Sequence, residues 1–119
     1  MAPARFLNGH PDAAAIHEEI ANAIAQLGDV TTTVQKSQIR FSRAHPFAAV
    51  WIPAKYLRGA TAPLVLTVFA NERLSSTRWK EVVEPAAGRF THHLELRAKS
   101  DVDAEVKRWL ERAWRQAGG

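Results

Sequence analysis

The spacing of hydrophobic residues changes twice along the chain. Apolar side chains recur every three or four positions over residues 12–27 and again over residues 101–116, a period typical of a helix with one buried face. Pro11 and Gly28 flank the first of these segments and suit the first turn and the end of a helix. Between the two segments the period falls to two, which is the period of a strand. The pattern therefore predicts a helix, several strands and a second helix.

The predicted strands are rich in β-branched, aromatic and aliphatic residues. They cover residues 30–34, 38–42, 47–52, 64–69, 78–83 and 90–97. Short links between consecutive strands favour antiparallel hairpins. Two amphipathic helices can bury their apolar stripes only against one face of such a sheet. We therefore predict an α+β two-layer sandwich, in which an antiparallel meander of five to six strands carries an N-terminal and a C-terminal helix on one face.

Two turns set the expected register. The segment Pro-Ala-Ala-Gly at residues 85–88 resembles a four-residue turn, which pairs Glu84 with Arg89. The further pairs of this register are Glu81 with His92, Lys80 with His93 and Trp79 with Leu94. In the first hairpin, pairing Val34 with Ile39 leaves Lys36 and Ser37 as the turn and keeps the apolar residues of both strands on one face.

Alternation along the strands then assigns side chains to faces. The residues expected toward the helices include Phe47, Ala49, Trp51, Trp79, Val83, Phe90 and Leu94, opposite Trp109 and Trp114 of the last helix. The open face is expected to hold Ala48, Val50 and Ile52 in its middle and Arg40, Arg78, Lys80, His93 and Arg97 at its rim. Because residues 47–52 and 64–69 are apolar on both faces, we expect them to be the central strands.

Composition limits the class of protein. A chain of 119 residues has the length of one domain, and we expect a single domain over residues 1–119, with an ordered core at about residues 11–117 and a short N-terminal arm. The absence of cysteine excludes disulfides, cysteine nucleophiles and cysteine-ligated metals. No apolar run approaches the length of about 20 residues that crosses a membrane, and the first residues lack the apolar core of a signal peptide. We expect a cytoplasmic protein without membrane contact.

Charge favours anionic partners in general but no extended basic surface. Sixteen Lys and Arg residues against twelve Asp and Glu give a net charge of +4. The basic residues are spread along the chain without a basic run, which disfavours nucleic acid as a partner.

The adjacent histidines His92 and His93 are the most conspicuous candidates for chemistry. Adjacent strand residues point to opposite faces, so the two imidazoles cannot readily share a metal ion, and we expect neither a metal nor another cofactor. His92, on the core side, is expected to be a structural histidine held by Glu81 or a carbonyl group. His93, beside Lys80 on the cationic face, is the better candidate for contact with a ligand.

Several segments together resemble the bacterial family called domain of unknown function 5655. They are KSQIRF at residues 36–41, Phe47-Ala48 followed by Trp51, RWKEVV at residues 78–83, Gly88-Arg89, THHLEL at residues 91–96, and Asp101, Asp103 and Glu105 of the closing helix. The resemblance covers roughly residues 11–117 and implies a stand-alone or appended bacterial domain without an established activity. It also implies that Lys36, Lys80, His92 and His93 form one functional neighbourhood.

An apolar floor with a cationic rim is typical of a ligand groove or of a homodimer interface. We expect the open face to bind a small anionic ligand or a partner, through Lys36, Arg40, Lys80, His93 and Arg97, with Ser37, Glu81 and His92 next to them. The first alternative is an interaction module that forms a homodimer and binds no ligand. The second is an enzyme that uses His92 with Glu81, or His93 with Lys80, as an acid–base pair. The sequence assigns no catalytic residue.

Overall fold

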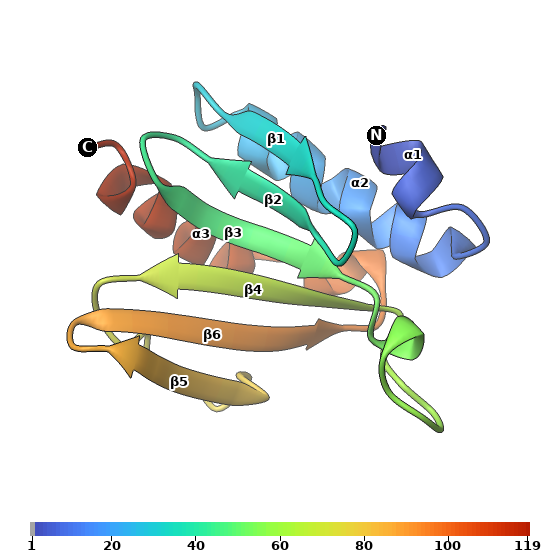
Figure 1. Cartoon of the computed structure of the whole chain (residues 1–119). Coiled ribbons are helices and arrows are strands. Elements are labelled where there is room, and N and C mark those ends of the chain that lie inside the picture. The colour runs from blue at the N-terminus through green and yellow to red at the C-terminus, as the bar shows by residue number, and fades with distance from the viewer. Residues whose placement is uncertain (1) are drawn as a thin grey trace.

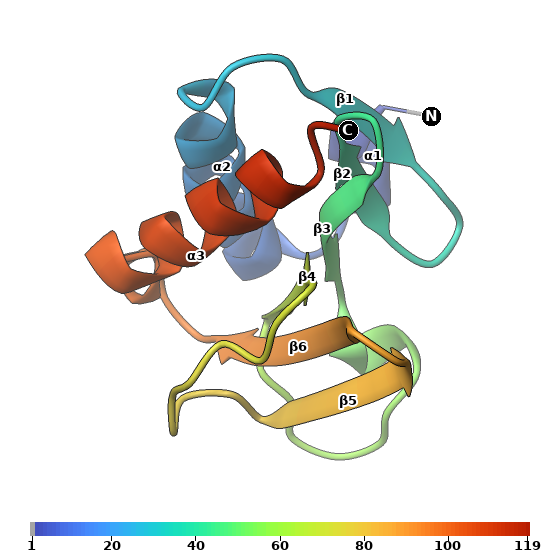
Figure 2. The same cartoon turned by 90° about the vertical axis from the view of Figure 1, so that its left-hand side faces the viewer.

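In a computed structural model, which describes residues 2–119, two long helices cover one face of a six-stranded antiparallel sheet (Figure 1). The helices are α1 (Pro3–Phe6), α2 (Pro11–Ala25) and α3 (Ala104–Gln116), and single 3-10 turns lie at Pro53–Lys55 and Lys99–Asp101. The strands are β1 (Thr31–Val34), β2 (Ile39–Ser42), β3 (Pro46–Trp51), β4 (Leu64–Ala70), β5 (Glu81–Ala86) and β6 (Arg89–Leu96). The predicted α+β class, with antiparallel strands and both long helices on one face, is confirmed (Figure 2).

The sheet follows a meander except at its last two strands. The strand order is β1-β2-β3-β4-β6-β5, so β3 and β4 are central, as predicted, and β6 lies between β4 and β5. The connection at residues 71–80 carries the chain past the place of β6 to the edge of the sheet. The composition of β5 suits an edge, because Glu81, Glu84 and Pro85 all discourage pairing with a further strand.

The register of the β5–β6 hairpin differs from the predicted one. Ala86 pairs with Arg89, so the turn is Ala87-Gly88 and not residues 85–88. Pro85 lies inside β5, where an edge strand tolerates its missing N–H group, and the register shifts between Val83 and Ala86. Two of the resulting pairs are Glu81 with His93 and Val82 with His92, so the predicted pairing of Lys80 with His93 is wrong by one residue.

The first hairpin has the predicted register. Val34 pairs with Ile39, and the Gln35 N–H donates to the Gln38 carbonyl oxygen at 2.8 Å. Lys36 and Ser37 form the exposed turn between them.

The predicted faces of β3 are wrong because the strand contains an extra residue. Phe41 pairs with Ala48 and Ser42 pairs with Pro46, which leaves Phe47 without a cross-strand partner. Such an inserted residue reverses the alternation that follows it. Ala48, Val50 and Ile52 lie in the core under the helices, and Phe47 is buried there as well. Ala49 and Trp51 stand instead on the open face, where they pair with residues of β4.

The core lies between the helices and the sheet. α2 contributes Ile16, Ile20 and Ile24, and α3 contributes Val106, Trp109, Leu110 and Ala113. Phe6 and Leu7 belong to the same core, although they precede residue 11, where we expected the ordered core to begin. Helix α3 begins at Ala104, three residues later than predicted, because the Asp103 carboxylate accepts the Val106 N–H at 3.1 Å and caps the helix there.

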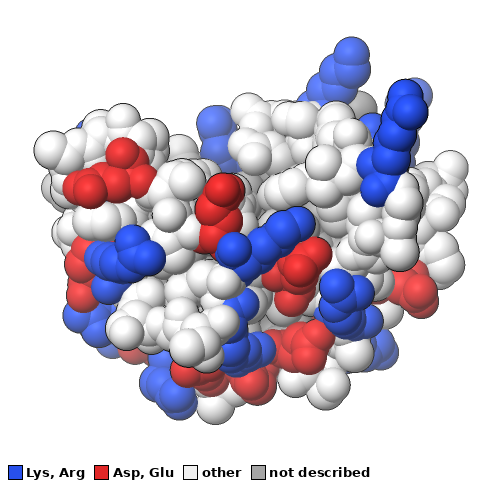
Figure 3. Space-filling view, turned by 90° about the horizontal axis from the view of Figure 1, so that it is seen from below, with Lys and Arg blue, Asp and Glu red and all other residues white. Residues whose placement is uncertain are grey.

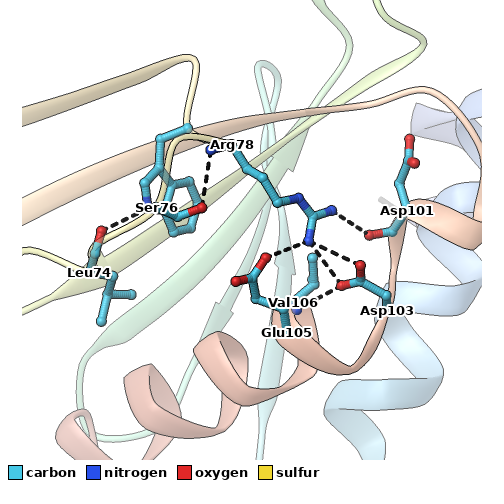
Figure 4. Close-up of polar contacts among 8 residues, drawn as sticks. Leu74, Ser76, Arg78, Asp101, Asp103, Glu105 and Val106 are labelled. Atoms are coloured by element: carbon cyan, nitrogen blue, oxygen red, sulfur yellow. Dashed lines mark hydrogen bonds and ion pairs between the residues drawn. The ribbon is translucent and has the colours of Figure 1, made fainter.

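Arg78 links the loop before β5 to the start of α3 by ion pairs (Figure 4). Its Nη1 atom lies 3.0 Å from Asp103 Oδ2 and 2.8 Å from Glu105 Oε1, and its Nη2 atom donates to the Asp101 carbonyl oxygen. The predicted place of Arg78 on the rim of the open face is therefore wrong. Asp103 acts both as helix cap and as ion-pair partner.

Within residues 2–119, no helix has the length and apolar character needed to cross a membrane.

Replacing Trp109 should test the core. Trp109 is 8% exposed and packs against Trp79, with 4.1 Å between ring centroids and 32° between the ring planes. We expect Trp109→Ala to lower the free energy of unfolding by about 3–5 kcal/mol, the usual cost of truncating a buried large aromatic residue. Denaturant titration measures this. The control is Tyr56→Ala, because Tyr56 is 55% exposed and its loss should cost about 0.5 kcal/mol or less. Equal losses in the two variants would contradict the assigned core.

Asp103 offers a second test of stability. Asp103→Ala should lower the free energy of unfolding by about 1 kcal/mol, because the helix cap is lost. Asp103→Asn keeps a capping oxygen and removes only the charge, so it should retain most of that stability, since exposed ion pairs contribute little. Both variants are measured by denaturant titration, and an Asn variant as unstable as the Ala variant would show that the ion pair, not the cap, is the stabilising interaction.

Candidate functional site

The register brings one residue from each strand into a single row across the open face. From β1 to β5 the row consists of Thr33, Arg40, Ala49, Thr67, His93 and Glu81. The side chains of a cross-strand row share one face of the sheet. Of the predicted ligand-binding residues, Arg40 and His93 therefore lie in this row, and Glu81 stands next to His93.

His93 is held by a chain of hydrogen bonds on the open face. Thr67 Oγ1 lies 2.9 Å from His93 Nδ1, and the Trp51 Nε1–H donates to the same Thr67 oxygen at 3.2 Å. The Trp51 ring also meets the His93 ring edge-on, with 6.4 Å between centroids. The imidazole is consequently fixed in orientation by β3 and β4.

The environment disfavours a charged His93. Burial lowers its pKa below the ordinary value of 6.5, the Glu81 carboxylate raises the pKa, and the Lys80 ammonium lowers it further. Loss of solvation on burial is the largest of these three effects on the pKa of His93.

Lys80 and Arg97 share one carboxylate. The Lys80 ammonium lies 3.6 Å from Glu95 Oε2, and Arg97 Nη2 lies 3.9 Å from the same oxygen. Lys80 reaches the open face in this way from just outside β5, and its backbone N–H donates to the His93 carbonyl oxygen. Because Glu95 compensates their charges, these two predicted residues offer a weaker field to an anion than a free cation would.

Arg40 has no such compensation. Its Nε atom is enclosed and has no hydrogen-bond partner among residues 2–119. Arg40 also belongs to none of the ion pairs formed among residues 2–119. Because the Nε atom is closed to solvent, a bound oxyanion would meet the terminal nitrogens of the guanidinium, which likewise form no hydrogen bond or ion pair among residues 2–119.

Arg40 lines a groove of about 600 Å³. The groove runs from β2 and the β2–β3 turn to the β5–β6 hairpin, and both edge hairpins curve away from α2 and α3 on this side (Figure 2). Arg89 and His45 also line it, whereas none of the described lining residues is Asp or Glu. Apolar surface comes from Phe69, Pro46, Pro85 and Phe90. The groove thus combines cationic groups with an apolar wall.

Other predicted residues are not brought together with His93. Lys36 and Ser37 are exposed in the β1–β2 turn, with β3 and β4 between their hairpin and β6, and neither lines the groove. His92 is fully buried on the helix side. Lys36, Lys80, His92 and His93 therefore do not form one neighbourhood in this structure.

His92 uses both ring nitrogens inside the core. Its Nε2 atom accepts the Leu74 N–H at 2.9 Å, and Nδ1 donates to the Val68 carbonyl oxygen at 3.1 Å. These partners fix His92 as a structural histidine. The predicted pairing with Glu81 is wrong, because Glu81 lies opposite His93 on the other face.

The sequence reasoning missed Thr67 and Trp51 as site residues. Thr67 had a visible signal, since it is the one polar residue in the strand LVLTVFA. Trp51 had none, because the inserted Phe47 reverses its face. The groove residues His45, in the β2–β3 turn, and Arg89, at the start of β6, come near Arg40 only in the folded sheet.

Charge on the β5 side of the molecule is mixed. Seen from below in Figure 3, Lys and Arg side chains alternate with Asp and Glu, so this face presents no patch of a single sign. Among residues 2–119, no three His, Asp or Glu side chains converge as metal ligands would.

A family model described as "Domain of unknown function (DUF5655)" matches residues 4–117, and the chain belongs to this family. The resemblance predicted from the sequence is thereby confirmed. No curated protein and no solved structure matches the chain.

The titration of His93 should report its environment. We expect its ring protons to titrate below pH 6.5 in the folded protein and near the ordinary value of about 6.5 when the chain is unfolded in urea. NMR measures both midpoints. Between the two values the unfolded chain binds more protons, so lowering the pH through this window reduces the free energy of unfolding. Burial lowers the pKa of His17 and His92 too, which adds to the same trend.

The matched variant is Glu81→Gln, which removes the carboxylate that raises the pKa of His93 and should lower the midpoint further. A folded midpoint at or above the unfolded one would contradict the assigned environment.

Proposed function

We propose that the open-face groove binds a small organic anion, with an apolar body and a carboxylate or phosphate group. One observation carries this proposal: among residues 2–119 the Arg40 guanidinium forms no hydrogen bond or ion pair, and the described lining of its groove contains no carboxylate. An arginine fork matches the two oxygens of a carboxylate or phosphate. Binding would give the Arg40 guanidinium an acceptor that it does not have among residues 2–119.

The size and lining of the groove support the same class of ligand. Its volume of about 600 Å³ lies within the range of small-molecule sites. Phe69 and Phe90 offer aromatic surface to an apolar ligand body, while Arg89 adds a second cation. A flat aromatic carboxylate or an aryl phosphate has the matching combination of groups.

The alternative function is homodimerisation through the open face. It is favoured by Val83, an aliphatic residue of β5 that is 39% exposed and pairs with Thr91 on this face. Sedimentation of the unliganded protein decides between ligand binding and homodimerisation, because a dimer that buries the open face would also close the groove.

Substitution of Arg40 tests the ligand proposal. We expect phenyl phosphate and benzoate to bind at millimolar concentration and to shift the amide resonances of Gly88 and Thr91, whereas neutral benzamide should not. Arg40→Met should weaken binding by about tenfold or more, the loss expected for one hydrogen bond to a charged group. Arg97→Met is the matched control, because among residues 2–119 the Arg97 side chain forms an ion pair only with Glu95, and Arg97 lies outside the groove lining.

Binding to the control variant should stay within about twofold of the unaltered protein. Failure of both probes to bind, or equal binding by the two variants, would refute the proposed ligand site.

A further inference from the structure

The groove carries a second arginine at the end opposite Arg40. Arg89, the first residue of β6, lines the groove beside the β5–β6 turn, whereas Arg40 lines it from β2. The strands β3 and β4 lie between β2 and β6, so the two arginines enter one groove from strands that are not neighbours. Like Arg40, Arg89 belongs to none of the ion pairs formed among residues 2–119.

The register of the sheet sets the separation of the two arginines. Arg40 shares a cross-strand row with Ala49, Thr67 and His93, and Arg89 precedes His93 by four residues on the same face of β6. Three strand spacings across the sheet and four residues along it separate the Cα atoms of the two arginines by roughly 20 Å. Because side chains stand roughly perpendicular to a sheet, arginines so far apart do not bind the same carboxylate.

The part of the groove between the two arginines is open and aromatic. Phe69 of β4 pairs with Thr91 of β6, and both residues are half-buried and line the groove. Phe69 follows Thr67 by two positions on the open face, toward the end of the sheet where Arg89 lies, so it stands near the line that joins the two arginines. On β3, the residue Phe47 is buried in the core and does not fill this space.

The helix side of the groove offers no free charge. Gln116 lines it, but the Gln116 Oε1 atom accepts the Asn71 N–H at 2.8 Å and its Nε2 atom donates to Glu72 Oε2 at 2.8 Å. The Glu72 carboxylate is paired with Arg112, at 2.6 Å between Oε1 and Nη2. The amide of Gln116 is thus already engaged, and the nearby carboxylate is neutralised.

The hairpin leaves the charge of Arg89 without a counter-ion. The Glu84 carboxylate of β5 accepts the Gly88 N–H at 3.0 Å and belongs to no ion pair among residues 2–119. None of the described lining residues is Asp or Glu. The groove therefore has an uncompensated arginine at each end and an aromatic ring between them.

We propose, on the basis of the function proposed above, that the ligand of this groove carries two anionic groups, one at each end of a flat apolar body. Arg40 binds one group, Arg89 binds the other, and Phe69 packs against the body between them. Arg40 is the stronger anchor, because its side chain is half-buried whereas Arg89 is exposed to solvent. Arg89 is then the residue that distinguishes a dianion from a monoanion of the same shape.

Three aromatic compounds separate the effect of charge from that of shape. Terephthalate has a carboxylate at each end of its ring, monomethyl terephthalate has the same shape with one charge, and phthalate has both charges on neighbouring ring carbons. Calorimetric titration should show that terephthalate binds about five- to tenfold more tightly than either of the other two. Its two equivalent carboxylates account for only twofold of the difference from the monoester.

Substitution of Arg89 should remove this preference. In Arg89→Met, terephthalate should bind within about twofold of the monoester, and the affinity for the monoester should change by less than about twofold. Arg97→Met is the matched control, because Arg97 follows the other end of β6, carries the same charge and lies outside the groove lining. It should keep the preference for terephthalate. Both arginines are exposed, so both variants should unfold at the temperature of the unaltered protein.

The outcomes distinguish the two proposals. If monomethyl terephthalate binds and depends on Arg40, but terephthalate binds no more than about twofold more tightly, the dianionic ligand is refuted and the groove site stands. The same holds if benzoate binds and none of the three compounds does.

Two further results would overturn the role of Arg89. A preference for terephthalate that survives Arg89→Met would show that Arg89 does not bind the second carboxylate. Equal weakening of terephthalate and its monoester by Arg89→Met would show that Arg89 binds the same anionic group as Arg40. If benzoate, phenyl phosphate and the three compounds all fail to bind, both proposals fail.

Discussion

The burial of β4 on both of its faces is the constraint on which the rest of the structure depends. Leu64, Leu66 and Val68 form the floor of the core under α2 and α3, and the intervening residues form the floor of the open face. Because β4 pairs with β3 on one side and β6 on the other, its alternation passes to both neighbours. The same register that buries His92 at Val68 therefore presents His93 at Thr67. A shift of one residue would exchange the two histidines and break the core and the site together.

The long helices and the order of elements were predictable because each depends on local periodicity. The first hairpin was predictable too, since only one pairing of Val34 keeps its apolar residues on one face. The predicted faces of β3 and the predicted register of the β5–β6 hairpin are wrong, because the hydrophobic pattern gives no signal at these two places. Residues 47–50 of β3 are all apolar, so nothing in their pattern reveals that Phe47 is inserted. Pro85 is usually a turn residue, and only the edge position of β5 explains its place inside a strand.

The candidate site, too, was predictable in part from the sequence. The position of Arg40 and His93 on the open face follows from alternation, and the structure places both there. The sequence could not show which cations lack an ion-pair partner, because the carboxylates that pair with the other cations come from distant segments. Arg78 meets Asp103 and Glu105 of the last helix, and Lys80 and Arg97 converge on Glu95. The net charge of +4 is therefore a poor guide to a binding site. Arg40, which has no ion-pair or hydrogen-bond partner for its side chain among residues 2–119, is a more specific indication of a binding site than the surplus of basic residues.

The central claim concerns the groove on the open face that Arg40 lines. A crystal structure of the protein grown with phenyl phosphate tests it most directly. The account predicts density for the phosphate within hydrogen-bond distance of the Arg40 guanidinium, with the ring toward Phe69. Phosphate density elsewhere with an empty open face, or an open face covered by a second copy of the chain, would contradict it.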